Sequence, residues 1–62
     1  MSKRKALWFK GLKWSEQQFE AGEYRAVDKM FDSWVAPEEF KIGVADYVSY
    51  YYTVLHPDAS IL

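Results

Sequence analysis

The sequence contains no cysteine, and in a chain of only 62 residues this is the strongest constraint on the fold. A domain of this size buries only about 60% of the surface that its unfolded chain exposes, and many such domains add disulfides or metal sites to compensate. Neither a disulfide nor a thiolate zinc site is available to this chain, and it has no thiol nucleophile. Its stability must therefore come from apolar packing, and the absence of cysteine fits a reducing compartment.

Aromatic side chains are the alternative source of buried surface. The chain has three Trp, five Tyr and four Phe, and half of its residues are apolar. Each large ring buries about 150–250 Å². Because this composition is too apolar and too aromatic for intrinsic disorder, we expect one folded domain over residues 1–62. Within it, residues 1–5 are expected to form a basic, flexible N-terminus and residues 57–62 a short C-terminal tail.

The first apolar stripe predicts a helix over residues 5–21, with Gly22 as its stop signal. The apolar residues on one face of that helix are Trp8, Leu12 and Phe19. Two details leave alternatives open. Gly11 predicts a kink inside the helix, and Ser15 followed by Glu16-Gln17-Gln18 has the form of a capping box, which would start a shorter helix at Glu16.

Two further helices are predicted over residues 23–35 and 37–55. The second helix has apolar residues at spacings of three and four: Tyr24, Val27, Met30, Phe31 and Trp34. Pro37 with two following carboxylates is typical of a helix start, and Pro57 ends the third helix. The stripe of that third helix comprises Phe40, Val44, Tyr47, Val48, Tyr51, Val54 and Leu55.

The predicted fold is therefore all-α, a small three-helix bundle whose first two helices form an antiparallel hairpin. Its expected interior contains Trp8, Leu12, Phe19, Val27, Met30, Phe31, Trp34, Phe40, Val44, Tyr47, Val48, Tyr51 and Leu55. The alternative is an α+β fold with a short two-stranded sheet, because residues 44–55 are rich in strand formers that would pair with residues 7–14. A short match between Phe9-Lys10-Gly11 and Phe40-Lys41-Ile42-Gly43 does not establish a repeat.

Charge is divided along the chain. Residues 1–13 carry a charge of +5 and residues 14–62 a charge of −6. The basic segment offers an alternative function, nucleic-acid binding, through Lys3, Arg4, Lys5, Lys10 and Lys13. The predicted third helix, however, has Lys41 as its single basic residue, and an overall isoelectric point near 5.7 provides little of the electrostatic attraction to phosphate that such binding needs.

The chain is poor in catalytic side chains. Its single histidine, His56, precedes a proline at a predicted helix end, where it is typical of a surface residue. We therefore expect neither an enzyme nor a bound metal or cofactor. No signal peptide or membrane-spanning stretch is recognisable, so we expect a cytoplasmic protein. A helix of residues 1–14 lying on an anionic membrane surface is the less favoured alternative, because its apolar residues spread around much of the helix.

Surplus aromatic residues favour a binding protein. In the run Tyr50-Tyr51-Tyr52, successive side chains point about 100° apart on a helix, so at least one ring is expected at the surface. A set of acidic residues would steer the protein to a basic partner surface. The candidate binding residues are Trp14, Ile42, Tyr50, Tyr52, Glu16, Glu20, Asp28 and Asp32.

The sequence thus predicts a small non-catalytic protein-binding module that covers the surface of a partner protein or associates with a second copy as a homodimer. This is the build of the accessory and inhibitor proteins by which phages and mobile elements modulate host proteins.

Overall fold

The computed structural model describes residues 2–59, in which three α-helices form: α1 (Lys3–Glu20), α2 (Tyr24–Asp32) and α3 (Glu38–Tyr50). Helix α3 continues into a π-helical turn, η1 (Tyr51–Leu55), and a 3₁₀ turn follows, η2 (Pro57–Ala59). No strand occurs in this part of the chain, so the all-α prediction is confirmed and the two-stranded sheet is not supported. Met1 and residues 60–62, the ends of the predicted N-terminus and C-terminal tail, lie outside the described residues.

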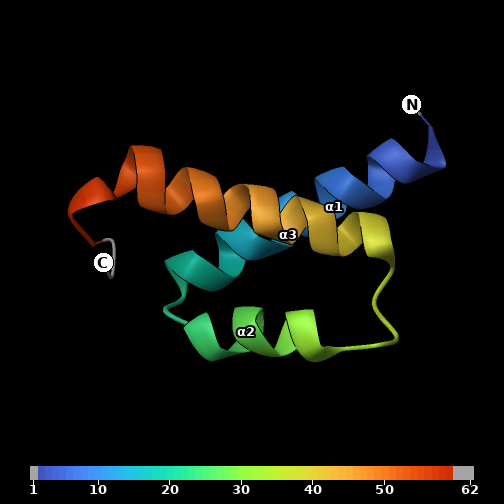
Figure 1. Cartoon of the computed structure of the whole chain (residues 1–62), viewed down its shortest axis with the longest axis horizontal. Helices are drawn as coiled ribbons and strands as arrows, with labels where there is room; N and C mark the ends of the chain where they lie inside the picture. Colours follow the sequence, from blue (N-terminus) through green and yellow to red (C-terminus); the bar gives the residue numbers. More distant parts are fainter. Residues whose placement is uncertain (1, 60–62) are drawn as a thin grey trace.

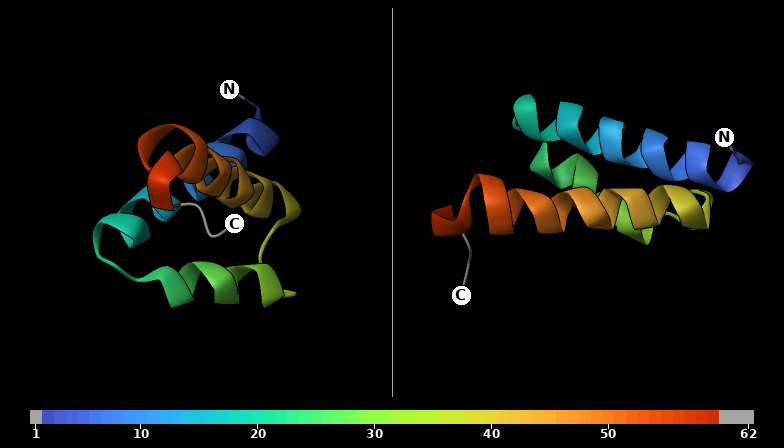
Figure 2. Two further views of the ribbon diagram at one scale, coloured as in Figure 1. Left: turned by 60° about the vertical axis from the view of Figure 1, so that its left-hand side comes forward. Right: turned by 90° about the horizontal axis from the view of Figure 1, so that it is seen from above.

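Helices α1 and α3 lie side by side and run in the same direction (Figure 1). The view from above shows the two helices adjacent along most of their length (Figure 2). The short helix α2 runs in the opposite direction, as expected for a hairpin with α1, and it contacts both long helices much less extensively than they contact each other. The molecule is therefore a tightly packed helix pair with a third helix laid against it.

Local signals set both ends of α1. The Ser2 hydroxyl accepts a hydrogen bond from the Lys5 N–H at 3.2 Å and caps the helix, which therefore begins at Lys3 rather than at residue 5. At the other end Gly22 has φ 75°, and the Glu23 N–H donates to the Gln18 carbonyl at 2.8 Å. This is a Schellman motif, and it turns the chain sharply toward α2.

Gly11 and Gly43 lie where α1 and α3 cross. A Cβ atom added to Gly11 would overlap the carbonyl oxygen of Phe40, and one added to Gly43 would overlap the carbonyl oxygen of Trp8. The two contacts are symmetrical. Phe40 lies three residues before Gly43, and Trp8 lies three residues before Gly11. Helix α1 is continuous through this point, as expected for the single longer helix, and Gly11 permits close approach of the two helices.

Ser15 is fully buried one turn after Gly11. Its hydroxyl donates to the Gly11 carbonyl at 2.8 Å, which satisfies the buried polar group inside the helix. Since α1 runs through Ser15 without interruption, the alternative capping box that would start a helix at Glu16 is not formed. A small side chain at position 15 continues the close packing that the glycine begins.

The buried apolar core of the described residues is small. Its four members are Phe19, Val27, Val44 and Tyr47, all of which lie on the predicted apolar stripes. Partly buried side chains pack around them, namely Leu12, Trp14, Met30, Phe40, Val48, Tyr51 and Tyr52. Many of the apolar side chains therefore remain in contact with solvent.

Three predicted core residues are exposed, and the ends of the helices explain why. Helix α2 ends at Asp32, because Ser33 takes an extended conformation with ψ 120°, so Trp34 lies on the following loop and is 90% exposed. Phe31, in the last turn of α2, is 41% exposed. Leu55, at the end of η1, is 45% exposed. The prediction that these side chains are buried is wrong, since the stripes extend past the point where a neighbouring helix covers them.

Candidate functional site

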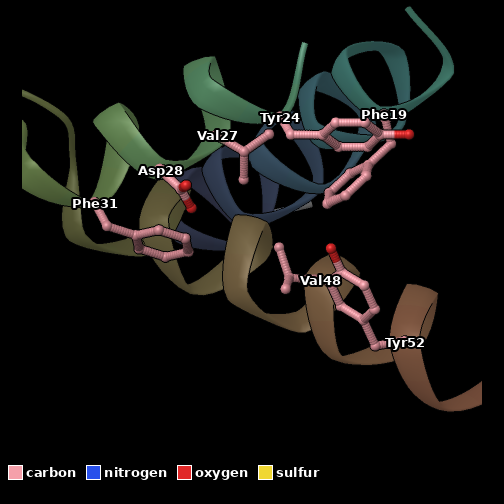
Figure 3. Close-up of a pocket in the computed structure, with 7 residues that line it drawn as sticks. All are labelled: Phe19, Tyr24, Val27, Asp28, Phe31, Val48 and Tyr52. Atoms are coloured by element: carbon pink, nitrogen blue, oxygen red, sulfur yellow. The ribbon is translucent and has the colours of Figure 1, made fainter. Parts of the chain in front are cut away.

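A pocket of about 230 Å³ opens between α2 and α3. Its seven lining residues are Phe19, Tyr24, Val27, Asp28, Phe31, Val48 and Tyr52 (Figure 3). We call this pocket the α2–α3 groove. Buried Phe19 and Val27 form its floor, whereas Tyr24 and Phe31 stand at its rim, each more than 40% exposed.

Helical spacing brings the lining residues together. Tyr24, Val27 and Phe31 recur at intervals of three and four along α2, so they lie on the side of that helix that faces the rest of the molecule. Val48 and Tyr52 are four residues apart on the opposite wall. Figure 3 shows the Tyr52 hydroxyl pointing from that wall into the groove. The groove exists because α2 touches α1 and α3 too lightly to close the space between them.

The tyrosine run packs on Phe19 at the start of the π-helical turn. Tyr51 stacks on Phe19 with ring centroids 4.4 Å apart, and Tyr52 meets Phe19 edge to face at 6.2 Å. The His56 N–H donates to the Tyr51 carbonyl at 2.7 Å, which closes the wider turn. Two consecutive rings thus contact the same phenylalanine. Tyr52 is half-buried in the groove, four residues after Val48 on the same side of the helix.

Trp34 and Val35 extend the apolar surface beyond the end of α2. They are 90% and 75% exposed, and they follow closely after Phe31, which lines one end of the groove. A tryptophan exposed to this extent is unusual on a free-standing surface, because burying a large aromatic ring is strongly favourable.

The structure separates the aromatic residues and the isoleucine that the sequence nominates for binding. Tyr52 lines the groove. Trp14 packs on Phe40, with ring centroids 5.8 Å apart, and is half-buried between helices. Ile42 and Tyr50 are about half exposed, and their positions on α3 lie well away around the helix from Val48. These four residues therefore do not form one patch.

The nominated acidic residues are also dispersed. Asp28 lines the groove, and Asp32 is exposed one turn further along α2. Glu16 pairs with Lys13 at 3.3 Å, and Glu20 is exposed near the end of α1.

Burial raises the pKa of the Tyr47 phenol above its usual 10.0, and the charges of Glu16 and Glu20 raise it further, so this core hydroxyl stays neutral at pH 7.

Three residues of this surface were missed by sequence reasoning. Phe31 and Trp34 were assigned to the core, and Val35 was given no role. The available signal was Pro37, because a proline restrains the residue before it and so favours a break in the helix ahead of it. A break starting at Ser33 leaves the next aromatic residue on a loop, away from the packed face.

The basic residues of the nucleic-acid alternative do not form a single stripe. They occupy positions 3, 4, 5, 10 and 13 of α1, which point to several sides of that helix. The Arg4 Nε donates to the Glu39 carboxylate at 3.0 Å, and Lys13 pairs with Glu16. Two of these cations are thus already in contact with carboxylates.

No protein-family model, curated protein or solved structure matches this chain. Among residues 2–59, no helix is both long enough and apolar enough to cross a membrane, and no three metal-binding side chains come together. The functional assignment therefore rests on the chemistry of the exposed surface.

Proposed function

We propose that this protein is a small non-catalytic binding module that docks a partner protein on the α2–α3 groove, with Trp34 as an anchor. The observation that carries the proposal is the 90% exposure of Trp34 three residues after Phe31, which lines an apolar groove, in a chain whose described residues include only four buried apolar side chains. Tryptophan is enriched among the residues that dominate binding energy at protein interfaces. By covering a surface of its partner, such a module inhibits or modulates that partner.

The dimensions of the groove support a protein ligand over a small molecule. Sites for small organic ligands usually enclose about 300–1,000 Å³. The groove is smaller, about 230 Å³, and it is open at a rim of aromatic side chains. A space of this size accommodates a protruding side chain of a partner, while Trp34 and Val35 cover the surface beside it.

The test is a peptide selected for binding to the wild-type protein from a random library and measured by fluorescence anisotropy. We expect Trp34→Ala and Phe31→Ala each to lower the affinity for the selected peptide by roughly thirtyfold, which is the effect of losing a central interface residue. Both side chains are exposed, so circular dichroism should show retained helicity.

The matched control is Ile42→Ala, which removes an apolar side chain of similar exposure on a different side of α3. It should leave peptide affinity within about twofold of wild type, since surface residues outside the contact contribute little. A strong loss of peptide affinity in Ile42→Ala, with no loss in Trp34→Ala, would place the peptide on the side of α3 that carries Ile42. That result would contradict the proposal.

A further inference from the structure

Asp28 is the single charged side chain among the seven residues that line the α2–α3 groove. The other six are aromatic residues or valines. Figure 3 shows its carboxylate on the α2 side of the groove, next to the ring of Phe31. Asp28 is exposed while the groove is empty. A ligand that covered its carboxylate would have to supply a group of opposite charge, because burying an unpaired charge is costly.

No side chain of residues 2–59 fills this requirement. Three other carboxylates have side-chain partners: Glu16 pairs with Lys13 at 3.3 Å, Glu39 with Arg4 at 3.0 Å, and Asp46 accepts from the Trp8 indole N–H at 2.6 Å. For Asp28, no ion pair or side-chain hydrogen bond with the described residues is formed. The carboxylate is thus free to receive a cation from outside.

The walls of the groove also suit a cation. Tyr24, Phe31 and Tyr52 contribute aromatic rings, whereas the buried Phe19 ring is already stacked against Tyr51 at 4.4 Å. The face of an aromatic ring carries negative charge density and attracts a cation placed over it within about 6 Å. Ring faces and a carboxylate together attract a positively charged side chain that is either planar or carried on an alkyl stem. An apolar side chain would not pair with the carboxylate, and an anion would be repelled by it.

We propose that the α2–α3 groove binds an arginine or lysine side chain presented by a basic, partly apolar segment of the partner protein. Arginine suits it better, because its planar guanidinium stacks on rings and donates two hydrogen bonds to one carboxylate. The flanking apolar residues of the segment contact Trp34 and Val35. This inference rests on the proposed function and specifies the chemistry of the partner.

A different protein is the better source of this cation than a second copy of the chain. The basic residues of α1 are dispersed around that helix, and two of them, Arg4 and Lys13, are already held by Glu39 and Glu16. The acidic excess of residues 14–62 also favours a partner whose contacting surface is basic.

The experiment uses the library-selected peptide and its derivative in which arginine is replaced by citrulline, which keeps the shape and removes the charge. We expect selected peptides to contain arginine or lysine beside apolar residues. The citrulline peptide should bind the wild-type protein about tenfold more weakly, and Asp28→Asn should weaken the arginine peptide by about the same factor. The citrulline peptide should bind Asp28→Asn only slightly more weakly than it binds the wild-type protein, because both changes remove the same interaction.

Asp32→Asn is the matched control. It removes the same charge from the same helix one turn away, at a residue that does not line the groove. We expect it to change affinity by less than about twofold, since exposed charges act only weakly at a distance in physiological salt. Equal losses in both variants would indicate general electrostatic attraction and overturn the inference.

Other outcomes separate this inference from the proposed function. Selected peptides without basic residues, or a citrulline peptide that binds as tightly as its parent, would overturn the cation site, while sensitivity to Phe31→Ala would still support docking in the groove. If neither Phe31→Ala nor Trp34→Ala weakens binding, the proposed function itself fails.

Light scattering tests whether the occupant is a second copy of the chain. A wild-type protein that is a dimer, with an Asp28→Asn variant that is a monomer, would show this and contradict the choice of a different protein as partner.

Discussion

Gly11 and Gly43 set the distance between α1 and α3. Their missing Cβ atoms leave room for the carbonyl oxygens of Phe40 and Trp8, so the two backbones come into direct contact. Close backbone contact brings Phe19, Val44 and Tyr47 into one small core. The geometry of the groove follows from this contact, because α3 supplies one of its walls.

Gly43→Ala should therefore destabilise the fold strongly. The new methyl group overlaps a backbone oxygen that cannot rotate away, so the helices must separate, and we expect a loss of about 3 kcal/mol in the free energy of unfolding. This loss should appear despite the better helix propensity of alanine. Urea denaturation followed by circular dichroism measures it.

The control for this variant is Ala45→Gly, an exposed position on the same helix. It should cost about 1 kcal/mol through helix propensity alone. A Gly43→Ala protein as stable as the Ala45→Gly protein would show that the helices do not approach as closely as described.

Helix α2 is the most weakly attached element. It buries Val27 and packs Met30 against the core, while its last turn and the loop after it leave Phe31 and Trp34 in solvent. One wall of the groove is therefore carried by the helix with the fewest contacts to the rest of the molecule. Elements with few buried contacts open at lower free energy than the global fold, and binding surfaces are often built from them.

Amide hydrogen exchange measured by NMR should show this difference. We expect the amides of α2 to exchange at least about tenfold faster than those of α1 and α3 at the crossing, because they open without unfolding of the helix pair. Addition of a groove-binding peptide should slow exchange in α2 selectively. Equal protection in all three helices would contradict the weak attachment of α2.

The sequence was sufficient to predict the elements but not their ends or their contacts. Spacing identified three helices and the buried residues Phe19, Val27, Val44 and Tyr47, because apolar periodicity directly reflects which side of a helix is covered. It could not show that α2 ends before Trp34, since the apolar spacing continues past the last helical residue.

The helix crossing and the groove depended on tertiary contacts. The short match around Gly11 and Gly43 corresponds to the two sides of one crossing, although the chain alone does not indicate which helix each glycine faces. Of the residues nominated for binding, Tyr52 and Asp28 lie in the groove, because each follows another lining residue, Val48 or Tyr24, by four positions. Which exposed residues share a surface depends on the α2–α3 arrangement.

At the scale of the whole molecule, a packed helix pair provides the fold, and an open third helix provides the proposed binding surface. The pair α1 and α3 provides the core, and α2 with the loop after it presents apolar side chains outward. A partner seated in the groove would add the buried area that a chain this short cannot supply by itself, and so would stabilise the fold on binding.

The most direct test of this account is an NMR titration of isotope-labelled protein with a peptide selected without regard to the groove. We predict that the largest shift changes fall on Phe31, Val48, Tyr52 and the Trp34 indole, and that signals of Ile42 and Tyr50 change little. The largest changes at Ile42 and Tyr50, with Trp34 unaffected, would show that the partner docks elsewhere and would contradict the account.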